Sequence, residues 1–134
     1  MKRRTFIYLT VAGGAALSMP IAACHHRDNS LSKTLGQPEL LGHICDESTI
    51  RNIGAAYRNR TPDEAQQDKL ISLLLTDGRS DHDKPKPTTD NGRLVSQLNT
   101  AVRNDYATGK ILTIHGWVLS LTEARQCALY SFNL

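Results

Sequence analysis

The sequence has few of the residues and motifs that build cofactor sites or catalytic sites. It holds three cysteines and one tryptophan in 134 residues, and aromatic residues make up 5% of the chain. It has no CxxCH haem motif, no CxxC pair, no GxGxxG or GxxxxGKS/T phosphate loop and no GxSxG elbow. No nucleophile, base and orienting group can be named from their spacing. We therefore expect no catalytic residue, no metal ligand and no cofactor bound by this chain.

The chain also lacks an apolar run long enough to span a bilayer, which takes about 20 residues. Its apolar stretch at residues 6–19 is shorter and is interrupted by two glycines. A charged start precedes this stretch, as in an export signal. The pair Arg3 and Arg4, followed closely by Phe6, has the form of a twin-arginine signal. The alternative is an ordinary secretory lipoprotein signal.

The leader ends in Ile-Ala-Ala before Cys24, which is the form of a lipoprotein cleavage box. We expect a signal peptide at residues 1–23 and two or three acyl chains on Cys24, since one chain anchors only marginally. Residues 24–37 are polar and predict a flexible tether to a domain at residues 38–134. The protein would be exported by the twin-arginine route and lipid-anchored on the periplasmic side of the envelope. No aspartate follows Cys24, which favours the outer membrane where the host has one.

Once the leader is removed, the chain has no excess of basic over acidic residues. Three of the 16 Lys and Arg residues leave with the leader, so 13 basic residues remain against 13 acidic ones. A nucleic-acid-binding protein needs a basic patch in its folded part. None is evident, and we expect no nucleic-acid partner.

If Cys24 carries the lipid, Cys45 and Cys127 remain. An oxidising compartment permits a disulfide between them. The alternative is that both are small buried apolar side chains. Spacing alone leaves both open, because a disulfide depends on geometry.

Helical spacing of apolar residues and capping signals place most of the domain in helices. A first turn at residues 38–43 carries Leu40 and Leu41. Asp46 is the expected N-cap of a helix at residues 47–59. The sequence from Thr61 to Glu64 has the form of a capping box, which opens a helix ending near Thr76. The apolar positions of these two helices are Ile50, Ile53, Ala56, Tyr57, Leu70, Leu73 and Leu74.

A further helix is expected at residues 92–107, with Asp90 or Asn91 before it and Gly109 as its C-terminal cap. Its apolar face consists of Leu94, Leu98, Ala101, Val102 and Tyr106.

Residues 110–119 predict a β-hairpin with a His115-Gly116 turn, packed on the helices through Trp117. Ser120 to Glu123 forms a second capping box. It opens a last helix to about Asn133 that buries Leu121, Ala124, Ala128 and Phe132. The expected fold is mostly α: about four helices and one short hairpin near the C-terminus, preceded by a cleaved export signal.

The twin-arginine leader, the short helical body and two later runs resemble a known group. The runs are Asp-Tyr-Ala-Thr-Gly-Lys at residues 105–110 and Glu-Ala-Arg-Gln-Cys-Ala-Leu-Tyr at residues 123–130. The chain is similar to the small subunits of bacterial membrane-bound gluconate and sugar dehydrogenases, known as gluconate 2-dehydrogenase subunit 3. The resemblance covers the leader and roughly residues 94–134.

The resemblance implies a non-catalytic subunit that binds no cofactor. It would export, assemble and anchor a large flavoprotein whose FAD oxidises a sugar or sugar acid, and a cytochrome subunit could accept the electrons. We expect Trp117, Leu121 and Phe132 to contribute to the docking surface. The alternative is a stand-alone envelope lipoprotein that acts as a structural or protein-binding module.

Overall fold

The computed structural model describes residues 28–76 and 90–133. Contacts divide the chain into two compact units, Met1–Ser30 and Leu31–Leu134. Of the described residues, only 28–30, at the start of the helix Asp28–Leu35, belong to the first unit. The export motif Arg3, Arg4 and Phe6 and the predicted lipidation site Cys24 lie outside the described residues.

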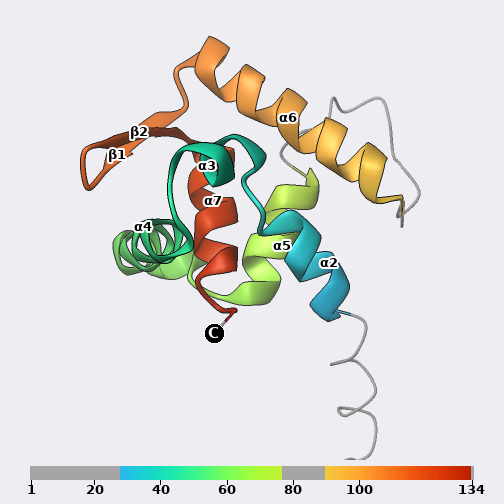
Figure 1. The fold of residues 1–134 in the computed structure, drawn as a ribbon, viewed down its shortest axis with the longest axis horizontal. Coiled ribbons are helices and arrows are strands. Elements are labelled where there is room, and N and C mark those ends of the chain that lie inside the picture. Colours follow the sequence, from blue (N-terminus) through green and yellow to red (C-terminus); the bar gives the residue numbers. More distant parts are fainter. Residues whose placement is uncertain (1–27, 77–89, 134) are drawn as a thin grey trace, which may run out of the picture. The chain divides into compact units, whose positions relative to one another are not determined.

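The described chain is mostly helical, with a two-stranded hairpin near its C-terminus, which confirms the predicted fold class (Figure 1). It has six α-helices where about four were expected. The elements are α2 (Asp28–Leu35), α3 (Glu39–Ile44), α4 (Glu47–Arg60), the 3₁₀ helix η1 (Pro62–Glu64), α5 (Gln67–Thr76), α6 (Asn91–Thr108), β1 (Ile111–Ile114), β2 (Trp117–Ser120) and α7 (Leu121–Tyr130). None of the helices in residues 28–76 and 90–133 is long and apolar enough to cross a membrane.

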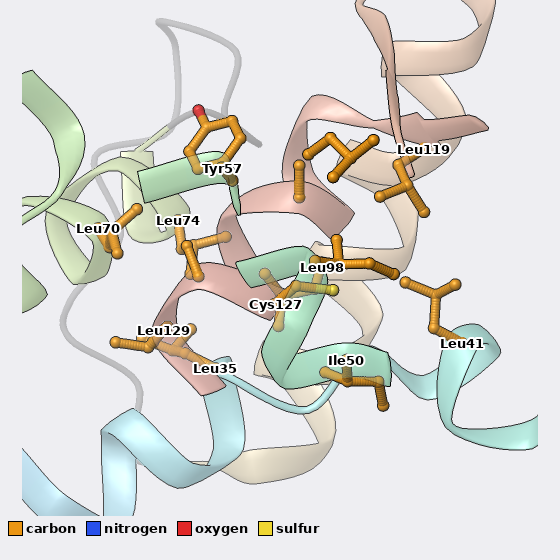
Figure 2. Packing of buried hydrophobic residues seen from close by; sticks show 14 of the residues in the cluster. Leu35, Leu41, Ile50, Tyr57, Leu70, Leu74, Leu98, Leu119, Cys127 and Leu129 are labelled. Carbon is orange, nitrogen blue, oxygen red and sulfur yellow. The ribbon is translucent and has the colours of Figure 1, made fainter. Parts of the chain in front are cut away.

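Helix α7 is the centre of the fold. It packs against α4, α5, α6 and the hairpin (Figure 1). Every residue from Thr122 to Leu129 is buried, so the helix is enclosed on all sides. Figure 2 shows Cys127 of α7 and Ile50 of α4 within the cluster that surrounds it. The buried cluster consists of Leu35, Leu41, Ile50, Ile53, Tyr57, Leu70, Leu74, Leu94, Leu98, Ile114, Leu119, Ala124, Cys127, Ala128 and Leu129.

Four of the predicted capping residues cap their helices as expected. Asp46 accepts a hydrogen bond from the Thr49 backbone N–H at 2.9 Å. Hydrogen bonding by the Thr49 side chain, and secondly by its backbone N–H, lowers the pKa of the Asp46 carboxyl group. Asp90 caps α6, and Gly109 ends that helix in the left-handed conformation with φ 74°. Ser120 and Glu123 form a complete capping box at the start of α7. These local signals position the ends of α4, α6 and α7.

The hairpin is also as predicted. β1 and β2 pair antiparallel, with Ile114 opposite Trp117. The two-residue turn has positive φ at both positions, 51° at His115 and 83° at Gly116, as a type I′ turn requires.

The predicted tether at residues 24–37 is wrong in its second half. Residues 28–35 form α2, and Leu35 at its end is fully buried in the core. Gln126 of α7 donates hydrogen bonds to the carbonyls of Leu35 and Gln37. The polar composition of this stretch concealed these partners, because they lie some 90 residues away in the chain.

The capping box predicted at Thr61 is wrong. Thr61 makes no side-chain cap; its hydroxyl donates to the Tyr57 carbonyl at the end of α4. Residues 62–64 form η1, and α5 begins at Gln67. The Glu64 carboxylate instead accepts two hydrogen bonds from Arg125.

Burial differs between neighbouring apolar residues. Tyr106, predicted on the apolar face of residues 92–107, is 47% exposed, whereas Val102 on that face is buried. In the first turn Leu40 is 61% exposed and Leu41 is buried. The last helix ends at Tyr130, before Asn133. Four further residues at predicted apolar or buried positions are only partly buried: Ala56, Leu73, Leu121 and Phe132.

Candidate functional site

A hollow of about 550 Å³ lies between α4 and the tip of the hairpin. We call it the α4–hairpin groove. Two of its lining residues, His115 and Trp117, come from the hairpin, and the others come from α4. The lining consists of Thr49, Asn52, Ile53, Ala55, Ala56, Asn59, His115 and Trp117.

The hairpin holds Trp117 at this groove. Trp117 is the first residue of β2, and its cross-strand partner Ile114 is fully buried. The indole is half-buried and packs against the core cluster while it lines the groove. Tryptophan in such a position offers a large apolar surface and one N–H donor, and it is enriched at protein interfaces.

The α4 side of the groove is built from small and amide side chains. Ala55, Asn52 and Asn59 are exposed on the outer face of the helix, whereas Ile53 is buried beneath it. Neither Asp, Glu, Lys nor Arg is among the described residues that line the groove. It therefore offers an apolar surface with neutral hydrogen-bonding groups.

The other two predicted docking residues are placed differently. Leu121 begins α7 and is half-buried at the edge of the core. Phe132 follows the end of α7, and the Arg58 guanidinium lies 3.8 Å from its ring centroid. Arg58 Nη1 also donates to the Ser131 hydroxyl at 3.3 Å. Neither Leu121 nor Phe132 lines the α4–hairpin groove.

The body of the last helix is unavailable for docking. The predicted docking residues Leu121 and Phe132 belong to the expected last helix, but residues 122–129 of that helix are buried against neighbouring elements. The structure therefore separates Trp117 from the helix that follows it in the chain.

A buried ionic cluster joins η1, α4 and α7. Arg125 donates through Nε and Nη2 to the two Glu64 carboxylate oxygens, at 3.0 and 2.9 Å. The Tyr57 hydroxyl donates to Glu64 Oε2 at 2.6 Å. The hydrogen bonds from Arg125 outweigh burial and lower the pKa of Glu64, whereas burial raises the pKa of Tyr57 to about 12. Glu64 is bonded to both Tyr57 and Arg125, so it links η1 to α4 and α7.

A second polar cluster joins α6 to the start of α7. Asp105 Oδ2 accepts from the Thr122 backbone N–H at 2.8 Å and from its hydroxyl at 2.7 Å. The Tyr106 hydroxyl donates to Glu123 Oε2 at 2.9 Å, the same oxygen that accepts from the Ser120 N–H. These bonds satisfy buried polar groups that would otherwise be costly.

Cys45 and Cys127 are free thiols in the structure. Cys45 is half-buried before α4, and its Sγ donates to the Leu41 carbonyl at 3.2 Å. Cys127 is fully buried. Burial raises the pKa of both thiols, that of Cys127 to about 12. Cys127 therefore packs as a small side chain in the core, whereas Cys45 is only half-buried.

Sequence reasoning named Trp117 but missed the α4 side of the groove and the Glu64–Arg125 pair. The outer face of α4 carries no motif, and Glu64 and Arg125 are 61 residues apart. Across residues 28–76 and 90–133, no three His, Cys, Asp or Glu side chains gather as a metal ion would require.

A scan of protein-family models, a search of curated proteins and a search of solved structures each found no match to this chain. The resemblance to small dehydrogenase subunits therefore stays a prediction from the sequence.

Proposed function

We propose that this chain is a non-catalytic accessory subunit that exports, assembles and anchors a flavin-dependent sugar or sugar-acid dehydrogenase. Its domain binds the large flavoprotein subunit through the α4–hairpin groove. FAD belongs to that partner, and a cytochrome subunit could complete the complex. The chain itself contributes no reacting group and no cofactor.

The observation that carries the proposal is that a half-buried tryptophan, Trp117, lines an open groove without charged residues. The buried charged groups of the domain, in contrast, are bonded within the fold. Glu64, Arg125, Asp105 and Glu123 each bond to a neighbouring element. Trp117 and the outer face of α4 form an uncharged surface that is open to another molecule. Aromatic side chains partly exposed beside a hollow are a common anchor for protein partners.

The leader supports a role in export. The twin-arginine route carries folded cargo, whereas the ordinary secretory route could thread so simple a domain unfolded. A large subunit that takes up its flavin before export, and that has no leader of its own, would need a partner with one. Arg3 and Arg4 supply the export signal, and the acylated Cys24 then holds the complex at the membrane.

Deleting this gene tests the proposal through the partner. The large subunit is expected to stay in the cytoplasm, and dehydrogenase activity is expected to disappear from the envelope fraction. A large subunit that still reaches the envelope, keeps its flavin and stays active would contradict the proposal. The stand-alone lipoprotein would then be the better description.

The leader has its own test. Changing Arg3→Lys together with Arg4→Lys should abolish processing of the leader, and Cys24→Ala should release the domain from membranes. The readouts are the electrophoretic shift on processing and the distribution between membrane and soluble fractions. Unchanged processing of the double-lysine variant in cells without the twin-arginine translocase would contradict the proposed route.

A further inference from the structure

We infer that the α4–hairpin groove takes an uncharged segment of a protein partner, which places an apolar side chain against Trp117 and pairs its peptide groups with Asn52 and Asn59. The inference rests on the proposed function only for the class of occupant, a protein. The chemistry of that occupant comes from the groove itself.

The first argument is size. The groove is open to solvent and has a volume of about 550 Å³, which falls in the range of roughly 300–1,000 Å³ typical of ligand sites. Two other hollows in the described chain, beside α3 and α6, enclose about 220 and 280 Å³. The α4–hairpin groove has space for several residues of an extended chain.

The second argument is charge. A carboxylate or ammonium group brought into this groove would meet no opposite Asp, Glu, Lys or Arg charge among the lining residues. Asn52 and Asn59 instead carry carboxamides, each of which donates and accepts hydrogen bonds. A peptide group also donates and accepts, so an uncharged main-chain segment matches the lining.

The third argument is the conformation of His115. A non-glycine residue with φ 51° is uncommon, and this turn type favours asparagine or glycine. His115 is exposed and lines the groove beside Trp117. The turn places the exposed His115 imidazole in the lining of the groove, where it can donate or accept a hydrogen bond.

The test is selection from a displayed library of random short peptides on the exported, lipidated chain purified in detergent. Enriched peptides should share a core without Asp, Glu, Lys or Arg and with at least one apolar side chain. Synthetic copies of these peptides should bind roughly tenfold more weakly to the Trp117→Leu variant. They should also bind more weakly to His115→Asn, a variant that suits the turn and should melt no lower than the parent.

Placing a charge in the groove gives the control. Asn59→Lys should weaken the uncharged peptides and enrich peptides with an acidic core, whereas Asn104→Lys, on the exposed side of α6, should change neither. Melting temperatures confirm that both variants fold. The inference would be overturned if peptides selected on the parent chain had charged cores, or if no peptides were enriched. It would also be overturned if Asn59→Lys changed neither the binding of the uncharged peptides nor the peptides selected. None of these outcomes affects the gene-deletion test, so the two proposals fail separately.

Discussion

The two faces of α4 show how one helix serves both stability and binding. Its inner face carries Ile50, Gly54 and Tyr57, all buried, and packs against α7. Its outer face carries Asn52, Ala55 and Asn59, all exposed. The inner face allows almost no change in side-chain volume, whereas the outer face tolerates substitution without loss of the fold. We therefore place stability on the inner face and partner binding on the outer face.

The largest expected effect comes from Gly54→Ala. A Cβ atom at position 54 would lie 2.0 Å from the Cys127 carbonyl oxygen, so the backbones of α4 and α7 would have to separate. We expect a loss of at least about 3 kcal/mol in the free energy of unfolding, measured by chemical denaturation. Gly42→Ala on α3 is the matched control, because its Cβ would meet nothing within 4 Å. It should be neutral or stabilise by up to about 1 kcal/mol, and equal effects at both positions would refute the close α4–α7 contact.

Glu64→Gln should have the next largest effect. It removes one partner of a buried pair and should cost about 2 kcal/mol at neutral pH, less than a fully buried pair because the Glu64 side chain is 24% exposed. The pKa of Glu64 in the folded protein is below its ordinary value of 4.5. Its contribution is therefore complete above pH 4.5 and is lost as the pH falls through the lowered pKa.

Denaturant titrations across this range provide the measurement. The parent should lose stability below pH 4.5, and Glu64→Gln should reduce that loss. Glu47→Gln is the control, because Glu47 lies 3.7 Å from Arg51 in a pair that is largely exposed. It should cost less than about 0.5 kcal/mol. Equal costs for the two variants would show that the Glu64–Arg125 pair does not hold η1 to α7.

Removing the hydroxyls of the two candidate capping boxes should give a smaller difference in the free energy of unfolding than the two comparisons above. Ser120→Ala removes an observed N-cap and should cost about 1 kcal/mol. Thr61→Ala removes a hydroxyl that caps no helix N-terminus. It bonds the Tyr57 carbonyl, which also accepts from the Thr61 backbone N–H, so the change should cost less than about 0.5 kcal/mol. Thermal unfolding of both variants is sufficient. A cost at Thr61 equal to that at Ser120 would favour the capping box that the sequence predicted there.

Local signals explain what the sequence could predict. Asp46, Asp90, Gly109 and Ser120 act on backbone groups within a few residues, so their roles are readable from the sequence. The His115-Gly116 turn is local in the same sense. These features located the starts of α4, α6 and α7, the end of α6 and the whole hairpin.

Long-range partners explain what could not be predicted. Thr61 and Glu64 carry a valid capping pattern, but Arg125 offers Glu64 two hydrogen bonds and burial that a cap does not provide. Gln126 likewise anchors the end of α2, which composition alone had assigned to a tether. The groove depends on tertiary packing as well, because Trp117 and Asn59 meet only when the hairpin folds onto α4.

The most direct test of the central claim is retention of the flavoprotein partner by variants of the outer face. Ala55→Arg places a long charged side chain in the groove, and Asn104→Arg places the same side chain on the exposed side of α6. Both variants should be exported, anchored and folded like the parent. The amount of FAD-containing large subunit in the membrane fraction should fall about tenfold with Ala55→Arg and remain unchanged with Asn104→Arg. Equal retention by the two variants would contradict the assignment of partner binding to the outer face of α4.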